Sequence, residues 1–131
     1  MSNGITMSWI PFAIALGAVL GSLSRYYVTL FWLEKLGKKF PYGTFFINLT
    51  GALLIGLAST MSAALTVPVE IQTLIMIGFL GAYTTFSSYI LDTANLFHNR
   101  RFSVGFFYWI GSPIVGFICI QFGIWIGQHL I

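Results

Sequence analysis

Charge is what this chain has least of. Of its 131 residues only 7% are charged, whereas 57% are hydrophobic and 18% aromatic. A soluble domain carries about 25% charged residues to cover its surface, so this composition excludes a water-soluble globule. A bilayer span takes about 20 apolar residues, and four spans with short loops would use the whole length. No room remains for a soluble catalytic domain, and a net charge of +3 is too small to indicate nucleic-acid binding.

The chain is also poor in cysteine and in basic residues near its beginning. Its single cysteine, Cys119, lies in an apolar run and cannot form an internal disulfide, so we expect it to serve packing. The opening MSNGITMSWIPF contains no Lys or Arg, whereas a cleavable signal peptide has a basic first region. We therefore expect the first apolar stretch to be retained as a helix.

Charged and helix-breaking residues divide the remainder into long apolar segments. The pattern predicts an all-α integral membrane protein with one four-helix domain over residues 1–131. The expected spans are, in order, about 9–33, 44–65, 71–96 and 102–131.

Basic residues occupy two of the three expected loops. With four spans, the first and third loops share one side of the membrane. The positive-inside rule predicts that side to be the cytoplasm, with both termini outside. The basic residues are Lys35, Lys38 and Lys39 in the first loop, and Arg100 and Arg101 in the third.

Glycine recurs at a spacing of four residues. Gly17 and Gly21 form such a pair in the first span, as do Gly123 and Gly127 in the last. In lipid, helices associate by close backbone approach rather than by apolar burial. We therefore expect these pairs to mark tight helix contacts.

Polar residues within spans are functional candidates by default. Arg25 could bond within the bundle as a structural residue, or attract an anion into a vestibule. Thr44, Asn48 and Gly51 follow at a spacing that puts them on one helical face. The Asn48 amide must find a neighbouring helix, a pore or an ion, because lipid offers it no partner.

The stretch GFLGAYTTFSSY, from Gly78 to Tyr89, combines two glycines with four hydroxyl residues at the centre of the third span. Both residue types weaken a helix, so the pattern predicts a local break. Broken backbone at membrane depth persists only where it is buried, lines a cavity or binds an ion. Phe86 and Tyr89 would share one face, and hydroxyl donors beside aromatic edges suit a small anion. A tolerated kink with aromatic packing is the other interpretation.

Three segments together resemble one known family, the small bacterial fluoride channels of the Fluc or CrcB family. They are GAVLGSLSRYY from Gly17, YGTFFINLTGALLIG from Tyr42 and the Gly78–Tyr89 stretch. The resemblance covers nearly the whole chain. It implies a passive, multi-pass channel in the bacterial plasma membrane that lowers cytoplasmic fluoride, built as an antiparallel dimer with two pores.

The resemblance also implies roles for individual residues. A structural sodium ion, not transported, would be held at the dimer centre by the backbone carbonyls of Gly81 and Thr84. The fluoride pore would be lined by residues from spans two, three and four, with the fourth-span match the loosest: Asn48, Phe86, Tyr89, Ser88 and Ser112.

The chain departs from the family pattern in two ways. The usual TTFSTF reads TTFSSY, so Tyr89 brings a phenol to the pore wall, which could alter the rate or disable one pore. The strong charge bias of the loops favours a fixed orientation, and hence an oppositely oriented paralogue as partner instead of a second copy of this chain.

Two other functions compete with a channel. A small dimeric multidrug exporter would need a central membrane carboxylate, but Glu34 and Glu70 lie in or beside loops, and Asp92 lies near a span end. A structural subunit of a membrane complex would explain the glycines but not the hydroxyl–aromatic stretch. Nothing in the sequence forms a nucleophile–base pair or a metal cluster, so we do not expect an enzyme.

Overall fold

The computed structural model describes the backbone of residues 3–130 and the side chains of residues 9–130, and within that range the chain is helical without strands. Four segments are long and apolar enough to cross a membrane, which confirms the predicted fold class. They are Trp9–Leu36, Tyr42–Leu65, Val69–His98 and Phe102–Leu130. The helical elements are α1 (Asn3–Leu36), α2 (Tyr42–Leu65), α3 (Val69–Gln72), η1 (Thr73–Leu80), α4 (Gly81–Tyr83), α5 (Phe86–His98) and α6 (Phe102–Leu130).

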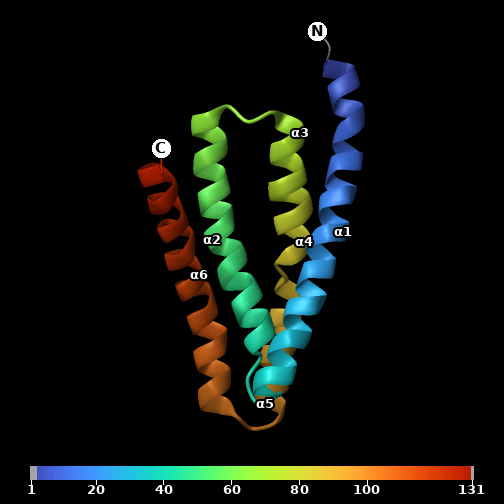
Figure 1. Cartoon of the computed structure of the whole chain (residues 1–131). Coiled ribbons are helices and arrows are strands. Elements are labelled where there is room, and N and C mark those ends of the chain that lie inside the picture. Colours follow the sequence, from blue (N-terminus) through green and yellow to red (C-terminus); the bar gives the residue numbers. More distant parts are fainter. Residues whose placement is uncertain (1–2, 131) are drawn as a thin grey trace.

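The helices form one elongated bundle (Figure 1). The start of α1, the end of α6 and the connection between α2 and α3 lie at one end of it. The two connections that carry the basic residues, 37–41 and 99–101, lie together at the opposite end. Both basic loops therefore share one side, as the positive-inside argument requires. That this side faces the cytoplasm stays a prediction.

Glycines set the closest helix contacts. Gly17 and Gly21 of α1 lie against the backbone of η1, and Gly123 of α6 lies against the carbonyl group of Leu53 in α2. A Cβ atom at any of these positions would collide with main-chain atoms of the neighbouring helix, and one at Gly127 would collide with a threonine side chain of α2. The structure confirms that the glycine pairs are contact sites, where van der Waals packing holds α1 on η1 and α6 on α2.

The third span is broken, as its glycines and hydroxyl residues predicted. The π-helix η1 passes into the single turn α4, which ends at Tyr83. Thr84 and Thr85 are extended, with φ/ψ of −76/156° and −149/118°. The chain becomes helical again at Phe86, where the Thr85 side chain accepts a hydrogen bond from the backbone N–H of Ser88 and caps α5.

Two buried clusters lie on either side of this break. The first cluster consists of Ile47, Leu80 and Tyr83. The second consists of Tyr89, Leu96 and Tyr108, with the partly buried Phe40, Phe45 and Val104 packed against it. The break therefore lies between two packed regions, not in a flexible loop.

Candidate functional site

A cavity of about 290 Å³ opens beside the break. We call it the break cavity, and α2, the broken backbone, α5 and α6 all contribute to its wall. None of its lining residues is charged. They are Asn48, Ala52, Ile55, Thr84, Thr85, Phe86, Tyr89 and Ile120.

The Asn48 side chain forms two hydrogen bonds with the broken backbone. Its Nδ2 donates to the carbonyl oxygen of Thr85 at 3.0 Å, and the N–H of Thr85 donates to its Oδ1 at 2.8 Å. The side chain thus gives the Thr85 N–H an acceptor in place of the helical carbonyl that the break removes. An amide carries two N–H donors, and this pairing uses one of them. Asn48 is therefore a cross-helix bond that also contributes to a cavity wall.

The break leaves carbonyl groups without their helical donors, and for two of them the structure shows where the donor has gone. In an unbroken helix, the carbonyl of Gly81 would accept from the N–H of Thr85, and that of Thr84 from the N–H of Ser88. Here the first N–H donates to Asn48 and the second to the Thr85 hydroxyl.

The surroundings of Gly81 are open. It is exposed, and a Cβ atom there would meet only the carbonyl oxygen of Met76, at 3.9 Å. Unwound backbone carbonyls of this kind coordinate sodium in membrane proteins. Gly81 and Thr84, the residues predicted to hold sodium, are thus among those whose carbonyls lose their helical donors, and such carbonyls fit the ion. Within residues 9–130 no cluster of His, Cys, Asp and Glu could hold a metal instead.

The two aromatic residues of the predicted pore differ in exposure. The Phe86 side chain is 74% exposed, whereas that of Tyr89 is 7% exposed, and their ring centroids lie 5.9 Å apart. The Tyr89 hydroxyl donates a hydrogen bond to the carbonyl oxygen of Trp109 in α6. The hydroxyl group that distinguishes this chain from the family pattern is therefore bonded to the backbone of a neighbouring helix.

The structure brings Asn48, Phe86 and Tyr89, together with Thr84 of the predicted sodium site, onto the break cavity, but three other predicted site residues lie elsewhere. Ser88, Ser112 and Arg25 are half-buried and line neither this cavity nor the one described next. The Ser112 Oγ atom is buried and has no hydrogen-bond partner among the described residues. The roles of these three residues stay predictions.

A second cavity, of about 310 Å³, lies at the end of the bundle that carries the basic loops. We call it the loop-end cavity. Unlike the break cavity, its wall includes the charged residues Lys38, Asp92 and Arg101. The complete set is Thr29, Trp32, Leu33, Gly37, Lys38, Phe40, Pro41, Tyr42, Gly43, Thr44, Asp92, Asn95, Leu96, Asn99 and Arg101.

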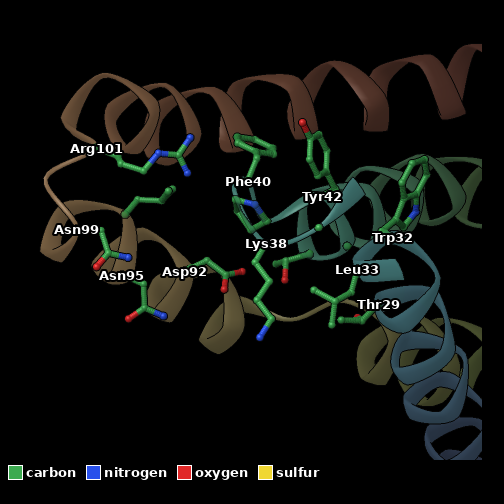
Figure 2. A pocket seen from close by; sticks show the side chains of 15 residues that line it. Thr29, Trp32, Leu33, Lys38, Phe40, Tyr42, Asp92, Asn95, Asn99 and Arg101 are labelled. Atoms are coloured by element: carbon green, nitrogen blue, oxygen red, sulfur yellow. The ribbon is translucent and has the colours of Figure 1, made fainter. Parts of the chain in front are cut away.

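Asp92 and Asn95 of α5, and Asn99 just beyond its end, bring polar side chains to the loop-end cavity. In Figure 2 the Asp92 carboxylate extends between Lys38 on one side and Asn95 and Asn99 on the other. The Tyr108 hydroxyl also donates to Asp92, at 3.4 Å. Sequence reasoning missed this group, although the spacing of Asp92, Asn95 and Asn99 along a helix places them on one face.

The two cavities lie at successive positions along α5 and are separated by aromatic rings. Phe86 and Tyr89 line the break cavity, and Asp92 and Asn95, each three residues further on, line the loop-end cavity. Between them lies the second buried cluster, in which the ring centroids of Tyr89 and Tyr108 are 5.3 Å apart.

Residues 12–124 match the model of a family described as CrcB-like protein, Camphor Resistance (CrcB). The chain belongs to the CrcB family. Two cyanobacterial members, from Trichormus variabilis and a Synechococcus species, are 49% and 47% identical to it and bear the name Fluoride-specific ion channel FluC. The alignments cover 90% and 88% of this chain, and 88% and 89% of those proteins.

More distant members of the CrcB family carry the same name. A protein from a Hydrogenobaculum species is 38% identical over 90% of this chain and 97% of its own length. These relatives are named for an ion channel and not for an enzyme. Together with the four spans, this makes the chain a multi-pass protein of a bacterial membrane.

Proposed function

We propose that this chain is the subunit of a fluoride channel that lets fluoride leave the cell passively and so lowers its toxicity in the cytoplasm. The observation that carries the proposal is the uncharged break cavity, whose wall combines the Asn48 amide with the aromatic side chains of Phe86 and Tyr89. The name borne by the relatives supports the same ion.

The chemistry of this cavity suits fluoride. Fluoride is small and strongly hydrated, so a pore must replace its water with other hydrogen-bond donors. The second N–H of Asn48 is one such donor, and aromatic ring edges present the positive end of the quadrupole. Ser112 is a further candidate, since its buried hydroxyl has no partner among the described residues, and Ser88 is a donor on the adjacent stripe of α5.

Charge at the loop end would supply anions to this path. Lys38 and Arg101 both line the loop-end cavity, whereas Asp92 is its one acidic residue. Clefts lined by charge of one sign raise the local concentration of the opposite ion. Arg25, half-buried on α1, could add to this attraction or serve the bundle structurally.

A sodium ion would serve as a structural cofactor bound to the backbone carbonyls of Gly81 and Thr84. It would satisfy carbonyls that have lost their helical donors and add positive charge beside the pore. These carbonyls provide too few ligands for one ion, so the proposal includes an antiparallel dimer in which the partner supplies the same pair. Gly81 is exposed and Phe86 is 74% exposed in the single subunit, so both are free to be covered by a partner subunit.

The partner is either a second copy of this chain or an oppositely oriented paralogue. The basic loops lie at one end of the bundle, a bias that favours one fixed orientation and therefore the paralogue. Mapping the accessibility of both termini in cells decides this point, because termini found on both sides of the membrane would indicate a dual-topology homodimer.

The direct test is fluoride efflux from liposomes that contain only this chain, in sodium, with chloride as the control anion. We expect fast, fluoride-selective efflux that the Asn48→Ala substitution abolishes. Replacing sodium by a large organic cation during purification and assay should reduce the dimer fraction and the efflux. Silence of this chain both alone and with an oppositely oriented paralogue would refute the channel, and drug-resistance assays would then test a multidrug exporter.

A further inference from the structure

Pro113 lies inside α6 and removes one backbone hydrogen bond. The N–H of residue 113 would donate to the carbonyl oxygen of Trp109, four residues earlier, but proline has no N–H. The proline ring also crowds that carbonyl. An unpaired carbonyl at membrane depth is costly, so it requires a donor from elsewhere in the bundle.

The donor comes from α5. The hydroxyl of Tyr89 donates to this same carbonyl oxygen of Trp109, and the Tyr89 side chain is 7% exposed, so water has little access to the pair. The residue that departs from the family pattern therefore bonds to the carbonyl that a proline in the neighbouring helix leaves without a partner.

We propose that Tyr89 is a positioning residue whose hydroxyl replaces the hydrogen bond lost at Pro113 and thereby holds the segment of α6 that carries Ser112 in place against α5. Ser112 is three residues beyond Trp109, about one helical turn, and directly precedes Pro113. Its buried Oγ has no hydrogen-bond partner among the described residues. It remains available as a donor to an anion.

This inference rests on the proposed function for its link to fluoride, but the hydrogen bond itself can be tested without it. It also bears on whether Tyr89, which stands where the family pattern has phenylalanine, disables one pore. Because the phenol is bonded to α6, Tyr89 presents its ring to the break cavity as a phenylalanine would, and both pores should conduct.

The test is a double-mutant cycle of Tyr89→Phe and Pro113→Ala, measured by fluoride efflux and by thermal unfolding in detergent. Tyr89→Phe alone should slow efflux about fivefold, the factor that corresponds to one ordinary hydrogen bond, and lower Tm by about 3 °C. Pro113→Ala restores a backbone N–H to the Trp109 carbonyl. In that background Tyr89→Phe should change efflux by less than about twofold, because the Trp109 carbonyl then has a backbone donor and no longer depends on the phenol.

Tyr83→Phe is the matched control. It removes a tyrosine hydroxyl that pairs with Thr50 at 2.9 Å, away from any proline, so its effect should be the same with and without Pro113→Ala. An equal effect of Tyr89→Phe in both backgrounds, or no effect in either, overturns the proposal.

The two readouts separate the outcomes. Coupling in Tm without coupling in efflux would show a purely structural bond and overturn the positioning role. If the unchanged protein and its paralogue complex pass no fluoride, the proposed function fails, and the Tm cycle still decides whether Tyr89 replaces the lost hydrogen bond.

Discussion

The break cavity and the loop-end cavity lie at successive positions along α5 but differ in how they would hold an anion. The break cavity has only neutral donors and ring edges, whereas the loop-end cavity includes Lys38, Asp92 and Arg101. A charged side chain at the centre of a bilayer costs at least about 2.5–3.5 kcal/mol. Charged side chains are therefore expected only near the loops, and selection of the ion deeper in the bundle would depend on neutral groups. Attraction and selection would thus occur in separate places.

Exchanging asparagine for aspartate in each cavity tests this difference most strongly. Asn48→Asp puts a carboxylate into the uncharged cavity and also removes the amide donor to Thr85, so we expect fluoride efflux to fall at least about 100-fold, the equivalent of that charge penalty. The measurement is fluoride efflux from liposomes. Asn95→Asp is the matched control, because it adds the same charge beside Asp92, and it should slow efflux by less than about fivefold. Equal effects at both positions would mean that the two cavities do not differ in this way.

The second prediction concerns how closely α2 approaches the break. A Cβ atom on the buried Gly51 would collide with the Thr84 side chain and meet the Tyr83 ring at 3.5 Å, whereas Gly116 of α6 has no described atom within 4 Å. Both are helical, so alanine would improve helix propensity at either position. We expect Gly51→Ala to lower the free energy of unfolding by about 1–3 kcal/mol through overpacking, and Gly116→Ala to leave it unchanged or raise it.

Thermal unfolding in detergent measures both glycine variants, and efflux gives a second readout. If Gly51→Ala displaces Thr84, the loss of efflux should exceed the loss of folded protein. A stable Gly51→Ala protein with normal efflux would show that the break tolerates movement of α2, contrary to the close contact described here.

Much of the fold followed from the sequence because its signals are local. Glycine and hydroxyl residues predicted a break within the Gly78–Tyr89 stretch, which the structure places at Thr84 and Thr85. The glycine pairs predicted helix contacts that the structure confirms. Asn48 was predicted to need a partner, but the identity of that partner depends on the rotation of α2 relative to α5, which no local pattern specifies. The bond between Tyr89 and the Trp109 carbonyl was hidden for the same reason, although Pro113 marked that carbonyl as one in need of a donor.

The third prediction compares two threonines of the third span. The Thr85 hydroxyl accepts from the N–H of Ser88 and caps α5, whereas the Thr93 hydroxyl donates at 2.8 Å to the Tyr89 carbonyl within the same helix. Valine is similar in shape but lacks the hydroxyl. Thr85→Val should lower the free energy of unfolding by about 1 kcal/mol, the usual value of an N-cap. Thr93→Val should lower it by less than about 0.5 kcal/mol, because the backbone hydrogen bonds of the helix remain when the side-chain hydroxyl is lost. Thermal unfolding of the two variants compares them, and a larger loss for Thr93→Val would contradict the cap.

The smallest effect should come from the charges at the loop end. Lys38 lies in an exposed connection, so its attraction for anions is screened by salt over a Debye length of about 8–10 Å at 0.1–0.15 M. Lys38→Gln should slow fluoride efflux about two- to threefold at low ionic strength and hardly at all in 0.5 M salt. Lys39→Gln removes a neighbouring charge that does not line the cavity, and it should have the weaker effect. An effect of long-range attraction is lost at high salt. If the slower efflux of Lys38→Gln persists at high salt, Lys38 binds the ion directly. Selection of fluoride over other anions would then extend into the loop-end cavity.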